Sequence, residues 1–338
     1  MSTAPDSPKA SKLGTLGSSF WLILLALAVI VFGANTGVAT YEGSRLSGAG
    51  TGAADLQVLS QQLANQGREA VAGNAEAFKS FKATQGQIDS TIATLKSRFG
   101  DEGAVAGPLE KLTETWAPLS KNAQQLTASE PAVLALAGNA DRFTAQVPQL
   151  QAQLNEVVRA MSASGAPSSQ IYNALQQVVV AGTMARRVTE IRAGGAGAAA
   201  AGDALARDAV VFGQVLDGLR NGNEDLGIAP LRNAAALTAL DQSQAQWTTM
   251  KKDLDAILGS SKNLFAAQSS AAALTNGAGQ MLEDSKKLFD AFSAFGSVRD
   301  TRLFPNFWLG IISGILALVS IVGLLWSLYR NRPREQEM

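Results

Sequence analysis

The stretch LFPNFWLGIISGILALVSIVGLLWSLY, residues 303–329, contains no charged side chain. A second uncharged stretch, LGTLGSSFWLILLALAVIVFGANTGVATY, occupies residues 13–41 near the other end of the chain. Each is longer than the roughly 20 apolar residues that a helix needs to cross about 30 Å of hydrocarbon. The two stretches therefore predict transmembrane helices over residues 16–40 and 303–329, and they place the chain among membrane proteins.

The basic residues that flank these stretches predict the orientation of the chain. Lys9 and Lys12 precede the first stretch, and Arg330, Arg332 and Arg334 follow the second. Because Lys and Arg next to a span stay in the cytoplasm, both tails, 1–15 and 330–338, are expected inside. Residues of about 42–302 are then expected in the periplasm, outside a bacterial inner membrane.

A cleaved signal peptide is the alternative interpretation of the first stretch. Gly37-Val38-Ala39 offers a small-x-small cleavage pattern after an apolar run. The uncharged stretch is longer than the apolar core of a signal peptide, however, and no polar start of a mature protein follows it. We therefore expect the segment to be retained as a span.

The composition of the chain excludes several classes of function. Its 338 residues include 28 basic and 28 acidic side chains, so no basic field is available for nucleic acid. His and Cys are both absent from the sequence. This excludes the usual zinc sites, thiol nucleophiles and Ser-His-Asp catalysis. We expect a protein without enzymatic activity, catalytic residues, cofactor or metal.

The region between the spans has the apolar spacing of long helices. Two of its stripes, at intervals of three and four residues or their sum of seven, are Leu109, Leu112, Trp116, Leu119, Ala123, Leu126 and Leu240, Trp247, Met250, Leu254, Ile257. Such narrow stripes are typical of helical bundles. Glycine-rich or proline-containing breaks near residues 100–103, 164–167, 193–197 and 221–230 divide the region into roughly six to eight helices. Pro108, Pro131, Pro167 and Pro230 are each expected in a first helical turn. The outermost helices are expected to continue into the spans.

The outer region also has the pattern of a diverged duplication. The spacing of Ile88, Ile92 and Leu95 is repeated by Phe212, Leu216 and Leu219. In each copy a proline and a leucine follow, and then a tryptophan in the apolar stripe, Trp116 or Trp247. We therefore expect an all-α, elongated extracytoplasmic region of two stacked helical modules, residues 41–165 and 166–302.

Several runs of this region resemble those of the PilJ-type receptors, the methyl-accepting chemotaxis transducers of bacterial type IV pilus and twitching-motility systems. The runs are 56–64 (LQVLSQQLA), 69–79 (EAVAGNAEAFK), 129–134 (SEPAVL), 147–151 (VPQLQ), 156–158 (EVV), 165–167 (GAP) and 207–216 (RDAVVFGQVL). Their order and spacing carry the resemblance from about residue 50 to residue 265. Gln62 departs from it, because such receptors have a basic residue there.

The resemblance implies the sensory half of a chemoreceptor, with a pilin or another pilus component as ligand and a homodimer as the working form. The chain stops nine residues after Tyr329. The linker module and the cytoplasmic signalling hairpin of such a receptor, which would contact an adaptor or kinase, are thus expected to be missing. Two other interpretations stay open: the input half of a sensor histidine kinase, and a structural scaffold of pilus or envelope assembly.

Four arginines are the candidate ligand surface: Arg68, Arg186, Arg187 and Arg192. They lie where the resemblance implies an input surface, but a solvated helix face or an ion pair between helices explains them better. Trp116 and Trp247 fit core packing better than partner binding. The glycines near residues 48–52 and 194–197 lack the strand and the Lys-Ser/Thr pair of a phosphate loop. Gly310, Gly314 and Gly323 are candidates for close packing of the second span.

Overall fold

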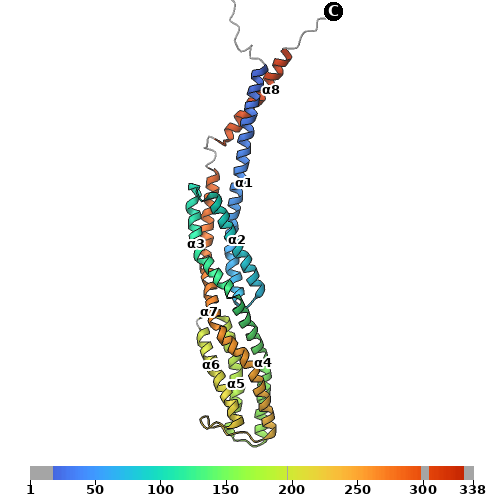
Figure 1. The fold of residues 1–338 in the computed structure, drawn as a ribbon, viewed down its shortest axis with the longest axis vertical. Coiled ribbons are helices and arrows are strands. Elements are labelled where there is room, and N and C mark those ends of the chain that lie inside the picture. The colour runs from blue at the N-terminus through green and yellow to red at the C-terminus, as the bar shows by residue number, and fades with distance from the viewer. Residues whose placement is uncertain (1–17, 196, 298–303, 331–338) are drawn as a thin grey trace, which may run out of the picture. The chain divides into compact units, whose positions relative to one another are not determined.

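The computed structural model describes residues 18–195, 197–297 and 304–330, and within these ranges the chain forms eight helices and no strand (Figure 1). The helices are α1 (Ser18–Val71), α2 (Ala75–Phe99), α3 (Gly103–Ala128), α4 (Glu130–Ala163), α5 (Ser168–Ala193), α6 (Ala198–Asn221), α7 (Ala234–Ser297) and α8 (Phe307–Arg330). The all-α prediction is confirmed. The basic residues Lys9, Lys12, Arg332 and Arg334, on which the predicted orientation depends, lie outside the described residues.

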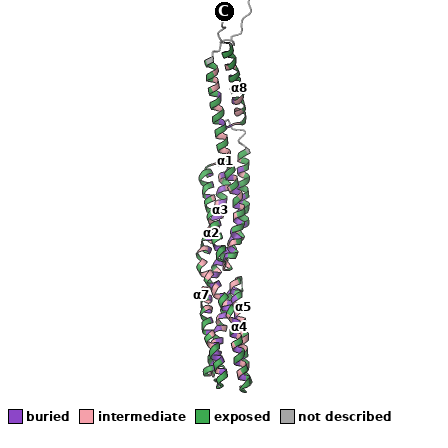
Figure 2. Ribbon diagram, turned by 90° about the vertical axis from the view of Figure 1, so that its right-hand side faces the viewer, coloured by how far each residue is buried: buried purple, intermediate pink, exposed green. Residues whose placement is uncertain are grey.

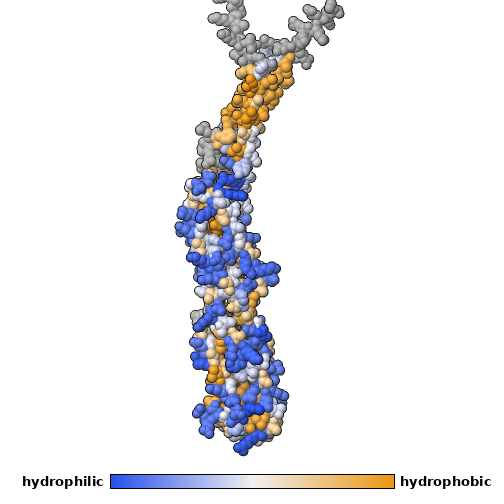
Figure 3. Space-filling view, in the orientation of Figure 1, coloured by the Kyte–Doolittle hydropathy of each residue, from blue (hydrophilic) through white to orange (hydrophobic). Residues whose placement is uncertain are grey.

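Two of the helices are long and apolar enough to cross a membrane, as predicted. They are Ser19–Val71 and Phe307–Tyr329, and in each the most apolar window is only 11% buried within the protein. Figure 3 shows the resulting apolar surface over α8 and the first part of α1. Apolar side chains that no protein covers are those that lipid solvates, so the pair supports a membrane protein.

The continuity of the helices differs at the two spans. The first span continues as a helix beyond its apolar part as predicted, because α1 is unbroken from Ser18 to Val71. The second does not, because α7 ends at Ser297, and residues 304–306 are not helical before α8 begins at Phe307. Pro305 lies in this break; it has no N–H to donate, and it disfavours the helical conformation of Phe304. The expectation of a continuous second helix gave too little weight to this proline.

The chain forms two compact units, which are described separately. The first unit comprises the residues up to Ala54, Arg98–Leu109 and the residues from Lys286 onward, and the second comprises Asp55–Ser97 and Glu110–Ser285. The first unit thus contains both apolar helices. The second contains most of the predicted outer region.

One end of the second unit is a bundle of α1, α2, α3 and α7. At Gly67 of α1, a Cβ atom would lie 3.4 Å from the side chains of Leu126 in α3 and Phe81 in α2. The same atom would lie 3.8 Å from Leu274 in α7. Residues of all four helices therefore meet at this level.

The other end of the second unit is a bundle of α4, α5, α6 and α7. Polar contacts between neighbouring helices connect the four in a ring: Gln151 to the Val178 carbonyl (α4 to α5), Arg187 to Asp208 (α5 to α6), Gln244 to the Leu216 carbonyl (α7 to α6) and Arg142 to Asp253 (α4 to α7). The predicted division of the outer region after residue 165 stays a prediction. In this bundle α4, which precedes that point, packs against α5.

The predicted stripes form the cores of these bundles (Figure 2). Every residue of the two stripes is buried, from Leu112 and Leu254 at 0% exposure to Leu119 at 8%. The predicted breaks also separate helices. Pro131 lies in the first turn of α4 as expected. Pro108 instead lies inside α3, Pro167 is the N-cap residue before α5 and Pro230 precedes α7, so these three expectations were wrong.

The proposed duplication has a structural counterpart in the two tryptophans. Trp116 Nε1 donates to Asp89 Oδ1 at 2.6 Å. Trp247 packs on Phe212 with ring centroids 4.5 Å apart, and a Cβ on Gly213 would lie 3.6 Å from Trp247 Nε1. When Ile88 is aligned with Phe212, Asp89 is aligned with Gly213. Each tryptophan therefore contacts the equivalent position of the preceding helix of its own copy.

Candidate functional site

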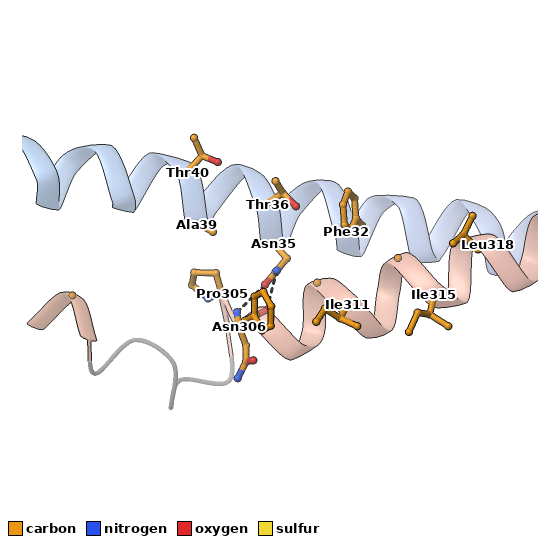
Figure 4. A pocket seen from close by; sticks show the side chains of 14 residues that line it. Phe32, Asn35, Thr36, Ala39, Thr40, Pro305, Asn306, Ile311, Ile315 and Leu318 are labelled. Atoms are coloured by element: carbon orange, nitrogen blue, oxygen red, sulfur yellow. Dashed lines mark hydrogen bonds between the residues drawn. The ribbon is translucent and has the colours of Figure 1, made fainter.

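The two apolar helices are joined by a polar contact between Asn35 of α1 and Asn306, the residue before α8 (Figure 4). Asn35 Nδ2 donates to the Asn306 carbonyl at 3.1 Å, and the Asn306 N–H donates to Asn35 Oδ1 at 2.9 Å. Asn35 is only 5% exposed although it lies in an otherwise apolar segment. One side-chain amide thus satisfies both backbone groups of one residue on the other segment.

Asn306 is available for this contact because it caps α8. Its side-chain Oδ1 accepts a hydrogen bond from the Trp308 N–H at 2.8 Å, the contact of an N-cap residue. Its carbonyl accepts the first helical bond from Gly310 at 3.1 Å, whereas its own N–H is not needed within the helix. The break at Pro305 therefore leaves the Asn306 N–H outside the hydrogen bonding of the helix, and it donates to Asn35.

Along its length α8 presents small residues to α1. A Cβ on Gly310 would lie 3.1 Å from Asn35 Nδ2, one on Gly314 would lie 3.7 Å from Phe32, and one on Gly323 would lie 2.6 Å from Trp21. At position 323 a side chain fits only if Trp21 moves, and at position 310 the Asn35 amide would have to shift by a few tenths of an ångström, whereas position 314 leaves room for ordinary contact. Close packing by small residues is the usual way in which helices associate in lipid, where the hydrophobic effect does not hold them together.

The serines of α8 are buried at intervals of seven residues, at Ser313, Ser320 and Ser327, with exposures of 5%, 0% and 9%. The hydroxyls of Ser313 and Ser320 donate to the carbonyls of Leu309 and Leu316 at 2.7 Å. A serine that binds its own helix leaves no unsatisfied polar group in hydrocarbon. The contact face of α8 is therefore small and internally satisfied.

A second contact layer of the first unit connects α1 to α7 through the end of α2. The Arg45 guanidinium lies 4.5 Å from the centroid of the Phe99 ring, donates to the Arg98 carbonyl and pairs with Glu102 at 4.0 Å. Phe99 in turn makes an edge-to-face contact with Phe292 of α7, with ring centroids 5.0 Å apart. Arg45 thus caps α2 with positive charge at its carboxyl end, where the helix dipole favours a cation.

An open groove of about 780 Å³ lies beside the Asn35 contact. Its walls include Phe32, Thr36 and Ala39 of α1 and Ile311, Ile315 and Leu318 of α8. Among the described residues, no group of three or more potential ligands could hold a metal ion. The arrangement offers no acid–base pair; it can fix or change the position of one helix against another.

The structure does not gather the four candidate arginines into one site. Arg68 donates to Asn65 Oδ1 at 2.6 Å on the exposed face of α1, and Arg186 pairs with Glu190 at 3.7 Å on the exposed face of α5. Arg187 pairs with Asp208 of α6 at 2.7 Å, with both side chains 26% exposed. The pair between Arg187 and Asp208 connects α5 to α6.

Arg192 makes the most extended set of contacts among the four. Its guanidinium pairs with Asp141 of α4 and donates to the Ala72 carbonyl in the turn between α1 and α2. Its own carbonyl accepts from Gln268 of α7 at 3.3 Å. Arg192 therefore lies where the two bundles of the second unit meet. Whether any of the four arginines contacts a ligand stays a prediction.

Sequence reasoning did not identify Asn35, Asn306 or Arg45. A signal was present for the first two, because an asparagine inside an apolar span is costly without a partner. Pro305 followed by an N-capping residue was a second signal, since it marks a helix start. For Arg45 the sequence contained no signal, because its partner Phe99 is 54 positions away.

Comparison with known proteins finds two similar sequences. No family model matches the chain. The chain is 30% identical over 288 residues to Protein PilJ of Pseudomonas aeruginosa, which is 83% of this chain and 42% of that protein. It is also 30% identical over 299 residues to a protein of Alcanivorax borkumensis described as methyl-accepting chemotaxis AlkN, which is 88% of this chain and 42% of that protein.

By their names, these relatives belong to the chemotaxis and pilus receptors, to which the chain is similar over most of its length. More narrowly, the similarity over most of the chain confirms its resemblance to PilJ-type chemotaxis transducers. The chain spans 42% of the length of each of the two relatives.

Proposed function

We propose that the chain is the transmembrane sensory input module of a type IV pilus chemoreceptor. In this proposal the outer helices bind a periplasmic or pilus protein, and α8 relays the event to a cytoplasmic signalling domain. The observation that carries the proposal is similarity to PilJ over 83% of a chain that has two apolar helices long enough to cross a membrane.

The proposed topology has both termini in the cytoplasm and residues of about 42–302 in the periplasm of a bacterial inner membrane. The positive charges beside both apolar helices support it. Two spans also require that both termini lie on one side.

The proposed relay is a small displacement of α8 relative to α1. Helix shifts in known switches are about 1–2 Å, and the small contact face of α8 suits such a movement. A ligand can drive the displacement only if it binds one of the two positions more tightly than the other. Because α1 is an unbroken helix without a hinge, it can serve as the fixed element against which α8 moves.

The proposed partners are a second copy of the chain and a pilin or another pilus component. The exposed Arg68 and Arg186 are the better candidates for an input surface, because Arg187 and Arg192 already hold neighbouring helices together. A downstream adaptor or kinase is a partner only of a protein that contains an output domain.

A hybrid receptor tests the proposal. The segment of P. aeruginosa PilJ that aligns with this chain is replaced by this chain, and twitching motility of a strain without its own PilJ is measured. A hybrid that restores pilin-dependent twitching supports a chemoreceptor input module. A hybrid that is stably inserted but gives no response to pilin would contradict it, and would favour a histidine kinase input or a scaffold.

A further inference from the structure

The contact between Asn35 and Asn306 is one-sided in a way that identifies the residue on which it depends. Asn35 contributes its side chain, whereas Asn306 contributes only its backbone N–H and carbonyl. Many residues at position 306 can therefore keep the contact, but at position 35 the contact requires a side chain that both donates and accepts with this geometry. The contact therefore depends on which residue occupies position 35, and much less on which residue occupies position 306.

We propose that Asn35 is the positioning residue of the relay, and that its amide holds α8 in one register against α1 in the absence of signal. The proposal deepens the proposed function, on which its meaning for signalling rests. Its structural content, a register set by one side chain, does not depend on what the chain senses.

The surroundings make this contact specific. Asn35 lies in an apolar helix, where an unsatisfied amide is unfavourable. The contact face of α8 consists of glycines and serines, and Ser313 and Ser320 already bond within their own helix. The other described contacts between α1 and this face are apolar, and they lack the directionality of a hydrogen bond. The amide supplies the directional contact.

The length of the two hydrogen bonds limits the movement that they permit. They measure 2.9 Å and 3.1 Å. A displacement of about 2 Å along the helix axis lengthens a bond lying across that axis to about 3.6 Å, beyond the range of a hydrogen bond. A relay movement of this size therefore has to break the contact. Its strength opposes the movement and thus sets how readily α8 leaves the resting position.

The glycine beside the contact supports the same interpretation. A Cβ on Gly310 would lie 3.1 Å from Asn35 Nδ2, which is closer than side chains normally pack. Gly37, on α1 near Asn35, has nothing within 4 Å of its Cβ position. Gly310→Ala is therefore expected to disturb the contact, and Gly37→Ala provides a matched control.

Disulfide formation measures the register directly, because the chain has no cysteine of its own. The full chain is reconstituted in lipid nanodiscs with Phe32→Cys and Gly314→Cys, two positions that face each other one turn from the contact. The rate of the intramolecular disulfide is measured in the parent and with Asn35→Leu, Asn306→Ser, Thr36→Val, Gly310→Ala or Gly37→Ala. Circular dichroism verifies that each variant is helical.

Asn35→Leu and Gly310→Ala are expected to slow the disulfide at least about threefold, the factor that corresponds to an average interhelical hydrogen bond in a membrane. Asn306→Ser, Thr36→Val and Gly37→Ala are expected to leave the rate unchanged. An unchanged rate in Asn35→Leu would overturn the proposal, and so would an equal slowing in Asn306→Ser, because the effect would then not come from the Asn35 amide.

The hybrid receptor separates this proposal from the proposed function. Slower disulfide formation in Asn35→Leu together with a silent hybrid would support the positioning role and contradict the receptor assignment. A responsive hybrid together with unchanged disulfide rates would do the reverse.

Discussion

Gly73, in the turn between α1 and α2, is a position where alanine should be strongly unfavourable for two separable reasons. Its φ of +94° lies in the left-handed region that favours glycine. A Cβ atom there would also lie 2.4 Å from the Cβ of Ala137 in α4. The conformation costs about 1–2 kcal/mol and the overlap about 1–3 kcal/mol. Gly73→Ala is therefore expected to lower the free energy of unfolding by about 2–5 kcal/mol.

Thermal unfolding of the full chain in detergent, followed by circular dichroism at 222 nm, measures this effect. At roughly 2–4 °C per kcal/mol for a unit of this size, Tm should fall by about 4–20 °C. Gly165→Ala is the control for conformation alone, because Gly165 has a φ of +71° but nothing within 4 Å of its Cβ position. Its expected cost is about 1–2 kcal/mol.

Ala137→Gly should rescue part of the loss. Once the Ala137 Cβ is removed, the nearest atom to the new methyl is the Ala137 Cα at 3.8 Å, an ordinary contact. In a double-mutant cycle the two changes should show a favourable coupling of about 1–3 kcal/mol. If the two effects simply add, or if Gly73→Ala costs no more than Gly165→Ala, the turn does not pack closely enough against α4 to exclude a methyl group at position 73.

Three further predictions concern the other contacts. Arg187→Ala should destabilise the protein by about 1 kcal/mol because it removes an ion pair between α5 and α6. Arg186→Ala removes an exposed ion pair within α5 and should cost about 0.3–0.5 kcal/mol. Chemical denaturation compares the two variants, and equal losses would contradict the role of Arg187 in joining the helices. Gly323→Ala should weaken the contact with Trp21 and shift the indole fluorescence, whereas Gly33→Ala, with nothing within 4 Å of its Cβ position, should not; identical spectra would refute this packing. Trp116→Phe should cost about 1 kcal/mol through the lost bond to Asp89, and the same substitution with Asp89→Ala already present should cost measurably less.

Much of the fold could be predicted from the sequence because apolar spacing reports burial directly. Leu112 and Leu254 lie at positions that repeat every three or four residues, and both are completely buried. Charge-free length likewise predicted α8 as a span. These signals are local, since each depends only on the period of a single helix.

Contacts between distant segments were not predictable in this way. Asn35 meets Asn306 across 271 positions, and nothing in either neighbourhood indicates the other. Arg192 illustrates the same limit for a charged residue. Its place in the family resemblance suggested ligand binding, but its contacts with Asp141 and the Ala72 carbonyl depend on which helix turns come together. Pro305 was visible in the sequence, and its effect on α8 needed only more weight.

The central claim is that a signal received outside changes the position of α8 against α1. The most direct measurement is the disulfide rate of the Phe32→Cys, Gly314→Cys chain in nanodiscs, with and without saturating purified pilin. The account predicts that bound pilin changes this rate at least about threefold, as expected for a helix shift of about 2 Å, which breaks the Asn35 contact. Demonstrated binding of pilin with an unchanged rate would contradict it.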